Sequence, residues 1–403
     1  MAKVEVSKFI SRLLERLQVG ISKRVRKCNL KQLFCQKYLA ISLSMGIKPS
    51  LSLLQRESHV NITPQGIHQF SQKVPLSKLE SLYSILANRL VHPNKRFFAV
   101  DGTRLAINRS VANSTPDYRL TPSGSYTDAL LTTVYDIGTK VPYKWNLTGH
   151  HDERRGFTSL INHFKRGDVV VFDRGYYSDE LLNQLRQRGI FYLFRLKNNS
   201  KMTRLKGVDV NIDGTSKRRV IYQFRGTPFS FLTNLGPKWS VSDLGDLYHK
   251  RWKVEEWYKT LKIRLNGQFY PQKRLDTVNK TILWQHIVNM VHRLLTWESD
   301  KGLNPMAPFQ TSQYYLSLHA VEVINCIYWE NEDKLIELIH FFSKFCLSRT
   351  DPGRSYERKS ITDGGKWYRG KGKSKGIKVS VKVPIKVQVK ILINVPNSKG
   401  IGK

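Results

Sequence analysis

The 403-residue chain has few acidic side chains: 31 Asp and Glu stand against 67 Lys and Arg, a formal net charge of +36. The positive excess runs along the whole chain and is not confined to one tail. It indicates a polyanionic partner, because Lys and Arg that neutralise phosphates release condensed counterions. A ribosome-bound protein, a membrane-surface protein and a basic protein without a dedicated partner are the alternatives.

Cysteine is scarce as well. The chain has four, none of which forms a C-x-x-C pair or has a close His that would complete a zinc pattern. This excludes the common zinc motifs and favours reduced thiols, as in a cytosolic protein. The four are Cys28, Cys35, Cys326 and Cys346.

Long apolar runs are also absent. No run approaches the ~18 residues that span a bilayer, which excludes a membrane-spanning helix. The N-terminal segment MAKVEVSKFISRLLERL is charged and amphipathic and lacks the apolar core of a signal peptide. We therefore expect a cytoplasmic protein with access to DNA and no membrane partner.

Residues 1–90 are predicted to be helical, because apolar residues recur there at helical spacing. Thr63 and Pro64 have the residue types of an N-cap and a first helical position. A helix, a break and a basic helix suit recognition of a DNA end, and a helical bundle that only packs on the rest suits the pattern equally well. No residue here gives a specific helix-turn-helix signature.

From residue 91 the pattern becomes mixed. The apolar runs 97–100 and 169–172 are typical of buried strands, and the second is bounded on both sides by polar residues. Strands and helices alternate irregularly, so the predicted class is α/β with a mixed sheet. The other expected elements are strands at 126–136, 141–148 and 190–196 and helices at 153–165 and 178–188.

Residues 198–240 are predicted to form a β-rich insertion, followed by a long helix over Ser242–Leu265. Helices are expected again at 282–297 and 313–345, within a C-terminal region of 276–350. The basic tail, 351–403, alternates apolar and polar residues from Ile377 to Ile391. This period of two suits a strand, and equally an addition outside the fold.

Three carboxylates stand out by position: Asp101 and Asp173 each follow a predicted buried strand, and Glu255 lies within the long helix. A carboxylate just past a buried strand lies at the sheet edge where α/β folds bind ligands. Two such Asp and a Glu packed over them suit two Mg²⁺ ions about 3.5–4 Å apart. Taken singly, an Asp after a strand is more often a turn residue or a helix cap.

The long helix adds to this pattern. At ~100° per residue, Tyr248, Arg251, Glu255 and Lys262 lie in a stripe roughly 60° wide beside the apolar face. A metal-binding Glu255 with the other three gripping phosphates explains all four residues. A surface Arg251–Glu255 pair, worth a few tenths of a kcal/mol, explains only two. Glu256 points away from the stripe, so Glu255 is the predicted ligand.

These residues resemble a known family. Tyr248-x2-Arg251-x3-Glu255-x6-Lys262 resembles the Y-R-E-K signature of the bacterial insertion-sequence transposases of family four, which cut and paste DNA through hairpins. Asp101-Gly102-Thr103 and Asp173-Arg174-Gly175-Tyr176 are similar to the family's two Asp motifs, and Phe194-Arg195-Leu196-Lys197 to its following basic strand. The resemblance covers about residues 95–300.

The resemblance implies a ribonuclease-H-like mixed-sheet catalytic core over 91–275, with the β-rich insertion at about 198–240. It also implies a helical N-terminal region, 1–90, that binds DNA ends, and a helical C-terminal region, 276–350, that helps to pair two protomers. The alternating tail has no counterpart in the family.

The implied activity is metal-dependent cleavage at terminal inverted repeats and strand transfer into target DNA in a bacterial nucleoid. Asp101, Asp173 and Glu255 are the implied ligands of two Mg²⁺ ions, with Mn²⁺ substituting. The implied partners are double-stranded DNA and a second protomer in a synaptic complex. Tyr248, Arg251, Lys262 and Arg195 are the expected DNA-binding residues, and Trp239, Phe229 and Phe231 are candidates to hold a flipped base.

Two rival hypotheses remain at this point. Another ribonuclease-H-like, metal-dependent DNA nuclease would share the three acids but would not need Tyr248, Arg251 and Lys262 at this spacing. A non-catalytic, domesticated DNA-binding relative would keep the basic charge and could lose any of the acids.

Overall fold

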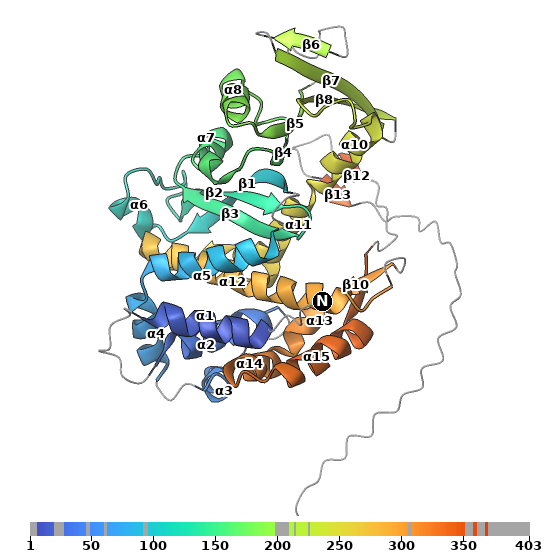
Figure 1. Cartoon of the computed structure of the whole chain (residues 1–403). Coiled ribbons are helices and arrows are strands. Elements are labelled where there is room, and N and C mark those ends of the chain that lie inside the picture. Colours follow the sequence, from blue (N-terminus) through green and yellow to red (C-terminus); the bar gives the residue numbers. More distant parts are fainter. Residues whose placement is uncertain are drawn as a thin grey trace, which may run out of the picture. The chain divides into compact units, whose positions relative to one another are not determined.

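The computed structural model describes residues 6–19, 28–45, 49–59, 63–91, 96–197, 209–212, 215–224, 226–304, 308–350, 358–360 and 367–369. Residues Met1–Arg349 form one compact unit (Figure 1). In the second unit, Thr350–Lys403, the described residues form a two-stranded antiparallel pair, β12 (Arg358–Ser360) with β13 (Trp367–Arg369). The alternating segment after Gly376 lies outside the described residues.

The first unit is built on a mixed sheet with the order β3-β2-β1-β4-β5-β8-β7-β6, and β9 pairs with β1. β1, β2 and β3 pair antiparallel, whereas β1, β4 and β5 run parallel. This order and these directions are those of a ribonuclease-H-like core, which confirms the predicted fold class. The strands are β1 (Phe97–Ile107), β2 (Thr127–Asp136), β3 (Val141–Thr148), β4 (Val169–Phe172), β5 (Phe191–Arg195), β6 (Asp209–Ile212), β7 (Thr215–Phe224), β8 (Thr227–Thr233) and β9 (Phe269–Tyr270).

The predicted insertion is β-rich in its described residues. β8 pairs antiparallel with β5, and β7 and β6 follow, so the insertion lengthens the central sheet. Residues 198–208, 213, 214 and 225 lie outside the described part.

Helices of the N- and C-terminal regions cover one face of this sheet. α5 and α12 pack on β3 and on each other, and the remaining helices of both regions pack around them (Figure 1). α12 contributes buried residues on nearly every side, because it lies between the sheet and the outer helices. The helices are α1 (Val6–Gln18), α2 (Leu30–Leu43), α3 (Leu51–Glu57), α4 (Pro64–Lys73), α5 (Leu76–Leu90), α12 (Leu275–Asp300), α13 (Gln313–Leu318), α14 (Ala320–Tyr328) and α15 (Glu332–Phe345).

The helix expected over 313–345 is divided into α13, α14 and α15. His319 leaves the helical conformation between the first two, and Glu330, with φ 54°, turns the chain between the last two. A left-handed residue cannot continue an α-helix, and the apolar periodicity does not register it. β10 (Phe309–Thr311) and β11 (Leu347–Arg349) form a separate hairpin-like pair beside these helices.

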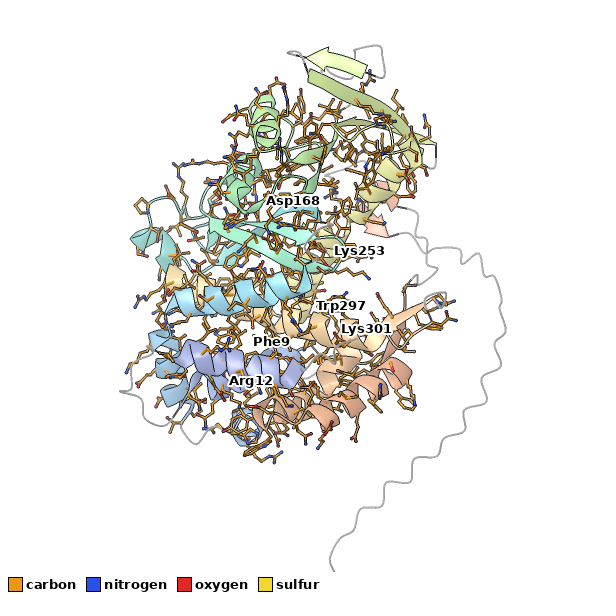
Figure 2. The ribbon with its side chains drawn as sticks, viewed as in Figure 1. Phe9, Arg12, Asp168, Lys253, Trp297 and Lys301 are labelled. Carbon is orange, nitrogen blue, oxygen red and sulfur yellow. The ribbon has the colours of Figure 1, made fainter. Side chains whose placement is uncertain are left out.

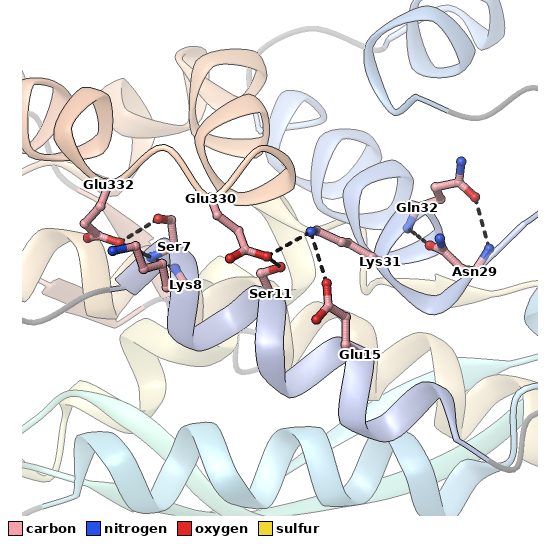
Figure 3. Close-up of polar contacts among 9 residues, drawn as sticks. All are labelled: Ser7, Lys8, Ser11, Glu15, Asn29, Lys31, Gln32, Glu330 and Glu332. Carbon is pink, nitrogen blue, oxygen red and sulfur yellow. Dashed lines mark hydrogen bonds and ion pairs between the residues drawn. The ribbon is translucent and has the colours of Figure 1, made fainter.

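The N-terminal helix is joined to the C-terminal region by one carboxylate. Glu332 accepts hydrogen bonds from the backbone N–H groups of Val6 and Ser7, both at 3.0 Å, and from the Ser7 hydroxyl at 2.6 Å. Figure 3 shows this contact beside the Lys31 ion pairs with Glu15 and Glu330. The two regions therefore pack as one body around the sheet.

Small helices cover the remaining loops of the core. The expected helix at 153–165 ends early, at Thr158, and continues as a single 3₁₀ turn. These elements are α6 (Ser110–Ser114), α7 (Glu153–Thr158), η1 (Ile161–His163) and α8 (Asp179–Gln187). Within the described part of the chain, no helix has the length and apolarity needed to cross a membrane.

Candidate active site

Asp101 and Asp173 lie side by side because of the strand register. β1 and β4 run parallel with Val100 opposite Phe172, so the next residue of each chain is one of the two acids. Successive side chains of a strand point to opposite faces. Both acids therefore share a face with Ala99 and Val171, which belong to the core cluster under α10 (Val241–Lys250) and α11 (Lys253–Lys259).

β1 is longer than the sequence pattern predicts. The expected strand ends at Val100, whereas β1 continues to Ile107 through antiparallel pairing with β2, so Asp101 lies within the strand. Pairing with β4 stops at Val100. Asp101 thus lies where one side of β1 loses its neighbour, and there its side chain can face a ligand.

The predicted long helix is divided into three segments. α10 ends at Lys250, Arg251 and Trp252 form a tight turn, and α11 is followed by a π-helical turn, η2 (Thr260–Arg264). The helical wheel fails here because it assumes a constant rotation per residue, which π-helical hydrogen bonding changes. The segments still dock on the sheet by their apolar face, and Tyr258 donates a 2.6 Å hydrogen bond to the Asp101 carbonyl.

Arg251 joins the acids. Its guanidinium is almost fully buried, 2.9 Å from Glu255 and 4.0 Å from Asp101. It also acts on Asp173 by lowering the pKa of that carboxyl. The Nε of Arg251 is buried and has no hydrogen-bond partner among the described residues. A single buried cation therefore stands where the three predicted acids converge.

The two Asp residues are held in different electrostatic states. Burial raises the pKa of Asp101 to about 7, and Glu153 and Glu255 raise it further against the opposing effect of Arg251. Burial acts on Asp173 in the same sense, but Arg251, the Arg174 backbone N–H and the Tyr248 hydroxyl outweigh it and leave the pKa of Asp173 lowered. Metal-free Asp101 is thus the carboxyl that takes up a proton near neutral pH.

Three of the four predicted phosphate-gripping residues gather at this site. Tyr248 donates a 2.8 Å hydrogen bond to Asp173, and Arg195 lies over the Phe229 ring at 4.4 Å and helps to lower the Asp173 pKa. Arg251 is the third. Lys262 lies elsewhere: the η2 turn carries it towards Asp128, while burial lowers its pKa.

Glu153 is an acid that the sequence reasoning missed. It was expected only to begin a helix, yet a Cβ on Gly102 would lie 2.9 Å from the Glu153 Cγ. Its carboxylate thus lies over the Gly that follows Asp101, and burial followed by Asp173 raises its pKa. The one signal in the sequence is the absence of a side chain at Gly102, which permits this approach.

The three aromatic candidates for holding a flipped base are placed in the core of the insertion. Phe231 is fully buried, and Phe229 packs on the core and carries Arg195 on its ring. Trp239 packs edge-on against Phe97, with ring centroids 5.9 Å apart.

A family model described as the transposase DDE domain matches residues 92–290, from just before β1 into α12. Residues 92–290 belong to the transposase DDE domain family. The DDE domain thus contains Asp101, Asp173, Glu255 and the helical segments that carry Arg251.

One curated relative of this DDE-domain chain is assigned as a transposase for insertion sequence element IS4SA in Synechocystis sp. (strain ATCC 27184 / PCC 6803 / Kazusa). The two are 26% identical over 194 residues, 45% of this chain and 56% of the relative, so the match spans little more than half of that protein. Among solved structures, the piggyBac transposase synaptic complex with hairpin DNA matches 88% of the chain and 85% of its own, with a TM-score of 0.46 and 10% identity. A likeness of this size establishes neither fold nor function.

The DDE domain has the donor set for a divalent cation with oxygen ligands. Asp101 and Asp173 are neighbours on one sheet edge, and Glu255 faces them from α11 through Arg251. Among the described residues, no three His, Cys, Asp or Glu side chains already stand at metal-ligand spacing. The carboxylates fit such an ion once Glu255 turns from Arg251 towards the two Asp residues.

Proposed function

We propose that the protein is an insertion-sequence transposase that cuts DNA at the element's terminal inverted repeats and joins the ends to target DNA. The observation that carries this proposal is the meeting of Asp101 and Asp173, neighbours on parallel strands, with Glu255, Arg251 and Tyr248 from the helical segments above them. The DDE domain family supplies the reaction class.

Asp101, Asp173 and Glu255 would hold the metal. Mg²⁺ suits carboxylate oxygens and keeps several water and phosphate ligands, and Mn²⁺ would substitute for it. A pair of such ions would supply an activated nucleophile and stabilise the leaving oxygen of a phosphodiester. Asp101 must lose its proton to serve as a ligand, so its raised pKa couples metal binding to pH.

Arg251, Tyr248 and Arg195 would position the DNA backbone. Arg251 is buried by its neighbours and presents a fixed guanidinium, whose planar fork matches the oxygens of a phosphate. When Glu255 turns to the metal, Arg251 loses a carboxylate partner at 2.9 Å and is free to take a phosphate oxygen instead. Lys262, half-buried beyond Asp101 along β1, would contact the backbone further from the cut.

The partners follow from the same chemistry. The net charge of +36 suits duplex DNA, both at terminal repeats and at the target. Joining two ends requires two active sites, so a homodimer in a synaptic complex is the expected assembly, acting on DNA in the bacterial cytoplasm. The helices of the N-terminal region would contact the repeats.

The test is cleavage of a labelled duplex that carries the element's terminal repeat, with Mg²⁺ or Mn²⁺, by the wild type and Glu255→Gln. We expect metal-dependent nicks or hairpins from the wild type and at least a hundredfold less product from the variant, because a metal ligand is lost. Glu256→Gln removes the same charge one residue away and should still cleave. DNA binding in EDTA should survive in both variants.

Each contrary outcome has a clear meaning. Equal cleavage by the wild type and Glu255→Gln would reject Glu255 as a metal ligand. Loss of cleavage in Glu256→Gln alone would move the ligand to Glu256. Binding without cleavage by the wild type, in either metal, would indicate a DNA-binding protein without transposase activity.

A further inference from the structure

A second polar cleft lies on the other side of α11 from Glu255. Its volume is about 630 Å³, and it is walled by the β2–β3 turn, α11 with η2, α12 and the β10–β11 pair. The cationic part of its lining comes from four separate elements. The charged residues of the lining are Lys140, Lys253, Lys259, Arg264, Arg293 and Glu256 (Lys253 is labelled in Figure 2).

Positive charge is concentrated here without matching negative charge. Glu256, the one acid in the lining, is already paired with Lys253 at 2.8 Å. Burial lowers the pKa of Lys140, and repulsion from Arg293 and Lys253 lowers it further, with only partial relief from Asp300. The fold therefore holds several cations close together at a cost in free energy.

These cations are fixed by the fold rather than gathered by chance on a mobile surface. Arg293 donates from Nε to the Thr139 carbonyl at 3.2 Å, and Lys140 donates to the Gln310 side chain at 3.1 Å. Asn289, which is 4% exposed, lines the same cleft with a buried Nδ2 that has no hydrogen-bond partner among the described residues. An unpaired buried donor amid unneutralised cations is the environment that an anion relieves.

We propose that this cleft binds the phosphodiester backbone of DNA outside the scissile position. The proposal rests on the proposed function only in taking DNA as the polyanion. Glu255 and Glu256 are consecutive, so one helix separates the catalytic acids from the cleft, and a strand held at Asp101 has this basic surface within reach. Phosphates would receive hydrogen bonds from Asn289 and charge from Lys140, Arg293 and their neighbours.

The test compares the double variant Lys140→Gln/Lys253→Gln with Lys165→Gln/Lys334→Gln, which removes two exposed lysines outside the cleft lining. Binding to a labelled duplex is measured in EDTA at several salt concentrations, so the result does not depend on cleavage. Each lost phosphate contact should reduce the slope of log Kd against log salt by about 1. We expect a reduction of about 1–2 for the cleft variant and no change for the control; equal slopes in both variants would overturn the proposal.

Folding and ligand source are separated by melting temperatures without DNA. Removing two mutually repelling charges should leave the melting temperature of Lys140→Gln/Lys253→Gln at or above that of the wild type, and a marked fall would show that the cations are structural. Inorganic phosphate is the second probe. If it stabilises the wild type but not the variant while both DNA slopes agree, the cleft takes a small phosphate and the DNA proposal is wrong.

Discussion

At the scale of single residues, the raised pKa of Asp101 makes a prediction about stability. The folded pKa of about 7 exceeds the ordinary value of 3.8, so the folded state binds this proton more tightly than the unfolded state. The linked stability is fully present below about pH 4 and is lost as pH rises through 7. At about 1.4 kcal/mol per pKa unit, the loss has an upper bound of about 4 kcal/mol.

Asp101→Asn removes this cost because Asn carries no charge at any pH. In EDTA we expect the variant to melt several degrees above the wild type at pH 8, and the two to converge near pH 4. Thermal melts by circular dichroism at both pH values check this. A variant that is less stable than the wild type at pH 8 would show that the negative charge of Asp101 stabilises the fold, through Arg251, and does not strain it.

At the scale of elements, Gly156 sets how closely α7 approaches the sheet. A Cβ at this position would collide with the Thr132 Oγ1 and lie 3.3 Å from the Thr132 Cβ, on the buried middle of β2. This close approach also brings Glu153, at the start of α7, over Gly102. The position of the unpredicted acid thus depends on a glycine one helical turn away.

Gly156→Ala should therefore destabilise the protein by about 1–3 kcal/mol, the usual cost of overpacking a core. Thr132→Ala removes the oxygen that the new methyl group meets, so the double variant Gly156→Ala/Thr132→Ala should regain much of the loss. Urea unfolding of the two single variants and the double variant measures this coupling. Strictly additive losses would mean that the two residues do not meet.

The sequence predicted the elements whose cause is local and missed those set by packing. The apolar run ending at Phe172 determines a buried strand by itself, and β2 and β3 follow from alternation. β1 continues past Val100 because β2 pairs with polar residues there, which no local pattern records. Likewise, the turn at Arg251 depends on burial of its guanidinium among acids from other elements, so a uniform wheel placed Lys262 with them wrongly.

The candidate site divides in the same way. Asp101 and Asp173 could be placed because parallel strands end at a common edge. Glu153 could not, because its approach depends on the fold of a loop and on two glycines. The basic cleft was equally hidden, since its cations come from a turn and three separate helical or strand segments.

At the scale of the whole molecule, the terminal regions form one body with the catalytic core. α1 packs on α2, α5, α14 and α15, and the compact unit runs from Met1 to Arg349. Ends of the chain that lie far apart in sequence therefore share one hydrophobic core. A force on the N-terminal helices, such as bound DNA would exert, is transmitted to the C-terminal helices through this packing.

Glu332 is the polar part of that joint. Its carboxylate is buried, caps the first N–H groups of α1 and meets the positive end of the helix dipole. Glu332→Gln keeps the size but loses the charge, so we expect about 2 kcal/mol less stability, the usual worth of a charge-assisted hydrogen bond. Glu337→Gln, an exposed change on the same helix, should cost almost nothing.

Urea unfolding measures both changes, and limited proteolysis locates them. Faster cleavage within α1 of Glu332→Gln, with the core of the sheet still protected, would place the loss at the joint between the two terminal regions. If Glu332→Gln is as stable as Glu337→Gln, the apolar contacts of Ile10 and Leu14 alone hold α1, and the carboxylate serves only to solvate the helix end. In that case the terminal regions would be joined by hydrophobic packing without an electrostatic lock.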